Sequence, residues 1–102
     1  MTDAALQSFR ASLAADTPPD PSPPLRAVWH ALRGEWDAAH DAVQPDTREC
    51  AWVHAALHRE EGDLDNARYW YACAVRPAAR GSARDEYLAI AAALLAERDA
   101  TG

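Results

Sequence analysis

The chain has 102 residues, which predicts a single domain spanning 1–102 and is too short for two independent cores. Hydrophobic residues make up 49% of it and charged residues 25%, and the prevalence of Ala over β-branched residues favours helices. The net charge is −6, so we expect no nucleic-acid partner, because an acidic domain repels a phosphate backbone. All ten basic residues are Arg, which excludes a lysine nucleophile or Schiff base.

No stretch of the sequence is apolar for long enough to cross a bilayer. The N-terminus also lacks the basic start and apolar run of a secretory signal. We therefore expect no membrane partner and a cytoplasmic location. Cys50 and Cys73 do not have the spacing of zinc ligands and are expected to be buried as small apolar residues.

The N-terminal part of the chain predicts one helix and a connector. Leu6, Phe9 and Leu13 recur at helical spacing, which predicts a helix over residues 3–15. Residues 16–24 hold five of the seven prolines and predict an extended connector that no helix crosses.

Residues 25–98 predict an array of short helices that end at glycines or loops. Gly34 and Gly62 are expected to end two of these helices, and Thr47 and Asp63 to cap two others. The predicted helices cover 24–33, 35–43, 47–60, 63–75 and 82–98. The residues expected to face inward are Leu25, Val28, Trp29, Leu32, Trp36, Ala39, Val43, Val53, Ala56, Leu57, Leu64, Ala67, Trp70, Tyr71, Ala74, Tyr87, Ile90, Ala91 and Leu94.

An internal repeat links two of the predicted turns. When the chain is shifted by about 28 residues, residues 27–43 lie over 55–71. The identical pairs are Ala27 and Ala55, His30 and His58, Gly34 and Gly62, Asp37 and Asp65, and Ala39 and Ala67. The repeat predicts two similar helix–turn–helix units.

The second unit resembles a known family. The stretch EGDLDNARYWYACAVRP (61–77) resembles the second half of a tetratricopeptide repeat, with matches at Gly62, Asp63, Ala67, Tyr71, Ala74 and, somewhat early, Pro77. The resemblance implies an all-α fold of five or six short helices in stacked antiparallel hairpins. It also implies a protein-interaction or scaffold module with a protein or peptide partner. Isolated repeats need stacking neighbours, which a homodimer would supply.

One constellation in the sequence could carry chemistry. His54, His58 and Glu61 stand at i, i+4 and i+7, so they share one stripe of a helix. Two imidazoles one turn apart can bind one metal ion, with Glu61 as a third ligand and His40 of the preceding helix as a fourth. These ligands suit zinc or another borderline divalent ion.

A structural role for these histidines is the alternative interpretation. The stripe lies beside the apolar positions Val53 and Leu57, and His30 occupies the repeat-equivalent place of His58. A residue type that recurs at equivalent positions of a repeat is typical of a packing role. No catalytic motif such as HExxH is present, so we expect no catalytic residue and no cofactor. The alternative function is that of a metal- or small-molecule-binding protein, an enzyme included.

A second candidate surface includes Tyr69 and Arg68. Tyr69 points about 100° away from Trp70 around the predicted helix. It is expected either to contact the final helix or to anchor a ligand or partner, because Tyr is enriched in binding hot spots. Together with His54, His58 and Glu61, these two residues form the predicted ligand- or partner-binding set.

Overall fold

The computed structural model describes the backbone of residues 2–101 and the side chains of residues 4–98. Within this part the chain forms helices and no strand, which confirms the all-α prediction. The helices are α1 (Thr2–Ala11), α2 (Pro23–Leu32), α3 (Trp36–Ala42), α4 (Arg48–Glu60), α5 (Leu64–Ala74) and α6 (Ala83–Thr101), with a 3₁₀ turn at Ser12–Ala14. No helix among the described residues is long and apolar enough to span a membrane.

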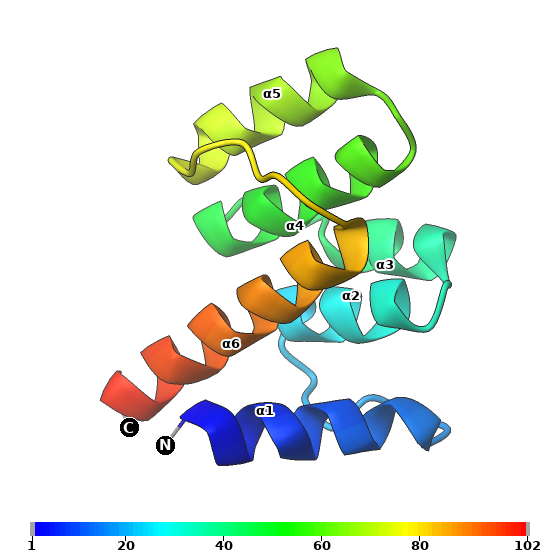
Figure 1. The fold of residues 1–102 in the computed structure, drawn as a ribbon, viewed down its shortest axis with the longest axis vertical. Helices are drawn as coiled ribbons and strands as arrows, with labels where there is room; N and C mark the ends of the chain where they lie inside the picture. Colours follow the sequence, from blue (N-terminus) through cyan, green and yellow to red (C-terminus); the bar gives the residue numbers. More distant parts are fainter. Residues whose placement is uncertain (1, 102) are drawn as a thin grey trace.

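Two antiparallel hairpins, α2–α3 and α4–α5, are stacked with their tight turns on the same side of the molecule (Figure 1). Gly34 and Gly62 stand in these turns with φ of 79° and 88°. Glycine adopts this left-handed conformation without the steric cost that a Cβ brings. The two glycines therefore end α2 and α4 as the repeat predicts.

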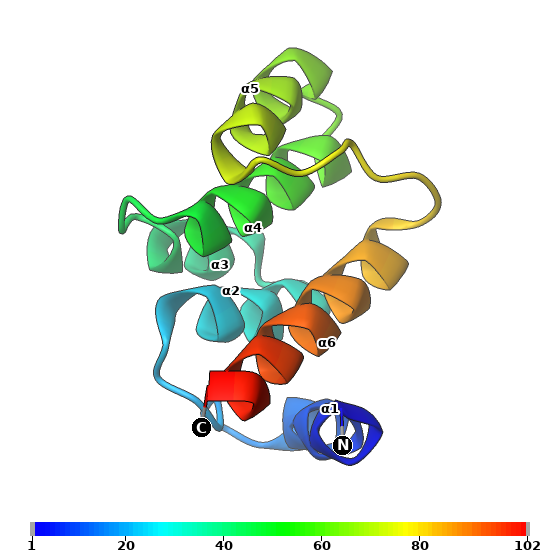
Figure 2. The same ribbon diagram turned by 90° about the vertical axis from the view of Figure 1, so that its left-hand side faces the viewer.

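The core lies where α6 crosses both hairpins. Figures 1 and 2 show α6 running obliquely over α2 and α4, with α1 packed beneath it and α5 at the opposite end. Trp29, Leu57, Tyr87 and Ile90 are among the largest fully buried side chains. They come from α2, α4 and α6, so one apolar cluster joins the two hairpins to the last helix.

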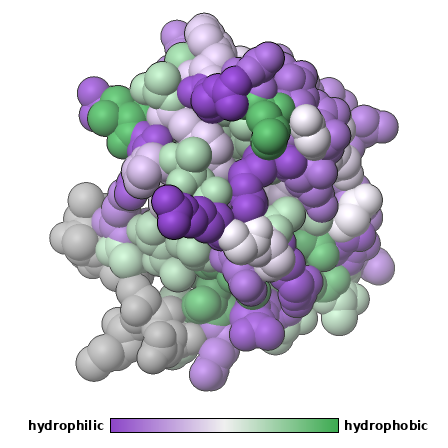
Figure 3. Space-filling model, turned by 45° about the horizontal axis from the view of Figure 1, so that its top comes forward, coloured by the Kyte–Doolittle hydropathy of each residue, from purple (hydrophilic) through white to green (hydrophobic). Residues whose placement is uncertain are grey.

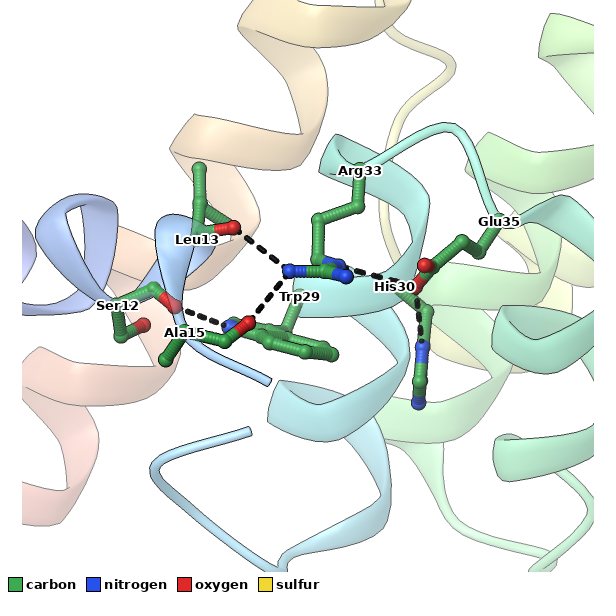
Figure 4. A network of polar contacts seen from close by, with 7 residues as sticks. All are labelled: Ser12, Leu13, Ala15, Trp29, His30, Arg33 and Glu35. Atoms are coloured by element: carbon green, nitrogen blue, oxygen red, sulfur yellow. Dashed lines mark hydrogen bonds and ion pairs between the residues drawn. The ribbon is translucent and has the colours of Figure 1, made fainter. Parts of the chain in front are cut away.

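A polar network fixes the end of α1 to α2 (Figure 4). The Arg33 guanidinium donates to the carbonyl oxygens of Leu13 at 2.8 Å and Ala15 at 2.7 Å, and lies 4.3 Å from the centre of the Trp29 ring. Trp29 Nε1 donates to the carbonyl oxygen of Ser12 at 3.1 Å. These bonds hold the 3₁₀ turn that follows α1 against the end of α2.

The structure corrects several expectations. The helix predicted over 3–15 ends at Ala11 and tightens into the 3₁₀ turn, while the last helix continues to Thr101. Leu64 is 55% exposed because it opens α5 at the outer end of the stack, beyond the reach of the core. Cys73 is exposed because it lies on a different face of α5 from the buried residues Ala67, Tyr71 and Ala74.

Candidate metal centre

Helix α4 carries two of the histidines that the sequence places on one stripe. Its N-terminus is capped by Thr47, whose hydroxyl accepts a 3.1 Å bond from the Cys50 backbone. His54 and His58 follow one turn apart on α4 and are only 6% and 7% exposed. His40 approaches them from the last turn of α3 and is partly buried.

The three imidazoles form a compact cluster. Nε2 of His40 lies 3.2 Å from Nε2 of His54. The ring centroids are 4.7 Å apart for His40 and His54, 5.4 Å for His40 and His58, and 5.7 Å for His54 and His58. One ring nitrogen from each histidine can be chosen so that all three lie within 4.8 Å of one another. The two hairpins thus bring together three imidazoles whose nitrogens could hold a metal ion.

Two tryptophans form the walls of the cluster. Trp36 of α3 stacks on His40 at 5.0 Å between centroids, and its Nε1 donates to the carbonyl oxygen of Leu57 at 3.0 Å. Trp70 of α5 stacks on His54 at 4.0 Å. These contacts restrict ring rotation, so the imidazoles are held in place before any ligand arrives.

Hydrogen bonds fix the tautomer of His58. Nδ1 lies 2.7 Å from Oε1 of Glu61, and a carboxylate only accepts, so Nδ1 carries the proton. Nε2 faces Nδ2 of Asn66 at 3.4 Å, and because an amide nitrogen only donates, Nε2 accepts there through its lone pair. A histidine that donates to a carboxylate through one nitrogen and offers the other to a metal is the usual arrangement in metal sites.

His54 is a neutral base with an incomplete set of hydrogen bonds. Burial, together with a smaller effect of nearby His40 and His58, lowers its pKa to about 4, so His54 is uncharged at neutral pH. Its Nδ1 is buried and has no hydrogen-bond partner among the described residues. Metal binding requires the neutral imidazole, and the environment of His54 supplies it.

The predicted site residues separate into two places. His40, His54 and His58 come together, with Glu61 against His58. Glu61 and the exposed Asp63 also form a second group of ligand atoms with His58. In that group only His58 is buried, whereas the three-histidine group has two buried members and one partly buried member.

Tyr69 and Arg68 lie outside the cluster. Tyr69 is 60% exposed, and its ring meets the edge of Trp70 at 5.1 Å. The Arg68 side chain is 68% exposed and pairs with Asp65 one turn earlier on α5. Exposed ion pairs of this kind contribute little to stability.

Three further residues of the centre, Trp36, Trp70 and Asn66, are missing from the predicted site. The two tryptophans are expected from their spacing to face the core, but spacing does not show that they stack on histidines. Asn66 stands four residues after Gly62, in the first turn of α5. A side chain at that position points towards the end of α4. This place in the sequence is the signal that could indicate Asn66 as a residue of the site.

Comparisons with protein-family models, curated proteins and solved structures found no match for this chain. The functional argument therefore depends on the geometry of the cluster.

Proposed function

We propose that the protein binds one borderline divalent metal ion, Zn²⁺ first among them, through His40, His54 and His58. The observation that carries this proposal is the convergence of three imidazoles from two hairpins, with nitrogens within 4.8 Å of one another. Imidazole nitrogen is a preferred ligand of zinc and of its neighbours in the first transition row.

The charges around the cluster favour a cation. The chain has a net charge of −6, which raises the local concentration of cations at its surface. Glu61 accepts the Nδ1 proton of His58 and increases the electron density of that imidazole. His54 is neutral at pH 7, so the site does not have to release a proton from it before the metal binds.

Metal analysis tests the proposal. Protein purified without an affinity tag or chelator is expected to hold close to one equivalent of metal. After removal of the metal, calorimetric titration with Zn²⁺ should restore one equivalent. His40→Ala should weaken binding by more than the roughly 10- to 100-fold loss that removing a ligand's hydrogen-bond partner causes.

His30→Ala is the matched control. Like His40, His30 is partly buried in the last turn of its helix, and like His58 it pairs with a carboxylate, Glu35 at 2.8 Å. It should bind zinc as the wild type does. Absence of stoichiometric binding by the wild type, or equal losses in the two variants, would overturn the proposal.

A protein-interaction module is the second candidate, supported by exposed apolar side chains on α5 and at its C-cap. Leu64, Tyr69 and Val75 are 55%, 60% and 66% exposed. Figure 3 shows that hydrophobic residues on this end of the molecule are scattered among hydrophilic ones. Docking surfaces usually present a contiguous apolar patch, so this candidate has less support. Sedimentation over a wide range of concentration tests the homodimer, which a strictly monomeric species would exclude.

A further inference from the structure

Resting on the metal centre proposed above, we infer that Asn66 supplies the fourth ligand through its side-chain carbonyl oxygen. The centre is then closed and structural, with no position for a substrate. Three imidazoles alone would leave one tetrahedral position for water, as in catalytic zinc sites, whereas four protein ligands are typical of structural sites. The identity of the fourth ligand therefore decides what the metal does.

The separations of the polar atoms fit a tetrahedral ion. Ligands about 2.0–2.1 Å from zinc stand roughly 3.3 Å from one another at the corners of a tetrahedron. Nε2 of His40 and Nε2 of His54 are 3.2 Å apart, and Nε2 of His58 and Nδ2 of Asn66 are 3.4 Å apart. Two edges of the tetrahedron are thus close to their final length without the ion.

A rotation of the Asn66 amide converts its present contact into a ligand. Without metal, Nδ2 donates to the lone pair of His58 Nε2. When an ion takes that lone pair, a half turn of the amide exchanges Nδ2 for Oδ1 and presents a carbonyl oxygen to the ion. The backbone of Asn66 stays in place during this turn, because its N–H donates to the Asp63 side chain that caps α5.

The surroundings of the cluster leave little room for a substrate. His54 and His58 are buried, and Trp36 and Trp70 stack on the imidazoles. A pocket of about 420 Å³ does open elsewhere, beside Trp52, but none of the three histidines lines it. A bound metal is therefore expected to be enclosed by protein groups.

The closed centre links three helices. Its ligands come from α3, α4 and α5, so both hairpins contribute to one coordination sphere. Binding energy at such a site is folding energy, since the unfolded chain does not hold the ligands together. The metal would then stabilise the stacking of the two hairpins and would activate no water molecule.

Cobalt provides a spectroscopic test, because the visible absorption of Co²⁺ depends on its coordination number. The wild type loaded with Co²⁺ should show the intense bands of a four-coordinate ion, and azide should leave them unchanged. Asn66→Ala should weaken Co²⁺ binding about tenfold, and azide should then alter the spectrum by entering the vacant position. Asn66→Asp should bind more tightly, since a carboxylate is the stronger ligand.

Arg68→Ala is the control for charge. It makes α5 more negative by one unit, as Asn66→Asp does, but changes an exposed residue paired with Asp65. It should leave the spectrum unchanged and the affinity close to that of the wild type. A wild-type spectrum that responds to azide, or an Asn66→Ala protein that binds as tightly as the wild type, would overturn the assignment of Asn66 while leaving the three-histidine site intact. Failure of the wild type to bind Co²⁺ or Zn²⁺ would instead refute the site itself.

Discussion

The Gly34 and Gly62 turns share one backbone conformation. In the first, the N–H of Glu35 donates to the carbonyl oxygen of His30 at 2.9 Å, and in the second, Asp63 donates to His58 at the same distance. Each bond spans five residues and closes the end of a helix around a left-handed glycine, as in a Schellman motif. The 28-residue repeat therefore describes a repeated structure at these turns.

The surroundings of the two turns differ. His30 pairs with Glu35, whose pKa is lowered chiefly by that hydrogen bond and further by Arg33. His58 also pairs with a carboxylate, that of Glu61, which is not the repeat equivalent of Glu35, and it faces other imidazoles and Asn66 as well. A histidine–carboxylate pair at a helix end is thus a structural element of both hairpins, and only the second develops into a cluster.

The repeat shows which positions make this difference. His54 corresponds to Arg26 of the first hairpin, and Asn66 corresponds to Ala38. Neither residue of the first hairpin offers a neutral nitrogen or a carbonyl side chain as a ligand. These two positions, together with Glu61 in place of Arg33, therefore distinguish the second turn from the first, while the first hairpin itself supplies His40 to the candidate metal centre.

Of the changes that test the difference between the two turns, acidification is expected to have the largest effect on stability. The pKa of His54 is about 4 in the folded protein and 6.5 in an unfolded chain. Below pH 6.5 the unfolded state binds a proton that the folded state excludes, so stability falls as the pH drops towards 4. At 1.36 kcal/mol per pKa unit, the loss approaches about 3 kcal/mol. Urea unfolding of metal-free protein across this range measures it.

Matched variants isolate the contribution of His54. The groups that face it are His40 from α3, His58 from its own helix and the uncharged Trp70 from α5. His54→Leu should lose this part of the pH dependence, whereas His30→Leu should keep it. Parallel profiles of stability against pH for the wild type and His54→Leu would contradict the assignment of this pH dependence to His54.

The two carboxylates should differ in their effect on metal binding. Glu61→Gln removes the negative charge that orients His58 and should weaken zinc binding by about tenfold, the lower end of the range for such partners. Glu35→Gln makes the same change at the first turn, where the described residues form no histidine cluster, and should leave the affinity unchanged. Calorimetric titration of both variants compares them directly. Equal affinities would show that Glu61 does not support the site.

The sequence predicted what depends on local spacing. A separation of four residues on one helix places His54 and His58 together, and the helix that precedes it in the chain adds His40, so these three histidines could be found before the structure. Asn66 and Trp70 reach the cluster from α5, and the approach of a second helix depends on interhelical packing that periodicity does not specify. Leu64 was expected inside for a related reason, because helical spacing does not show where a stack ends.

Replacement of the turn glycines should have the smallest effect on stability, and the effect should be the same at both turns. An added Cβ would meet no atom within 4 Å at Gly34 or at Gly62, so the cost of Gly34→Ala and Gly62→Ala comes from backbone conformation alone. A left-handed residue with a side chain costs about 1 kcal/mol. Both variants should therefore lose about 1 kcal/mol in urea unfolding of metal-free protein. Clearly unequal losses would mean that the turns differ in backbone as well as in surroundings. Equal losses, with zinc affinity retained in Gly34→Ala, would locate the difference between the hairpins in the side chains around His58.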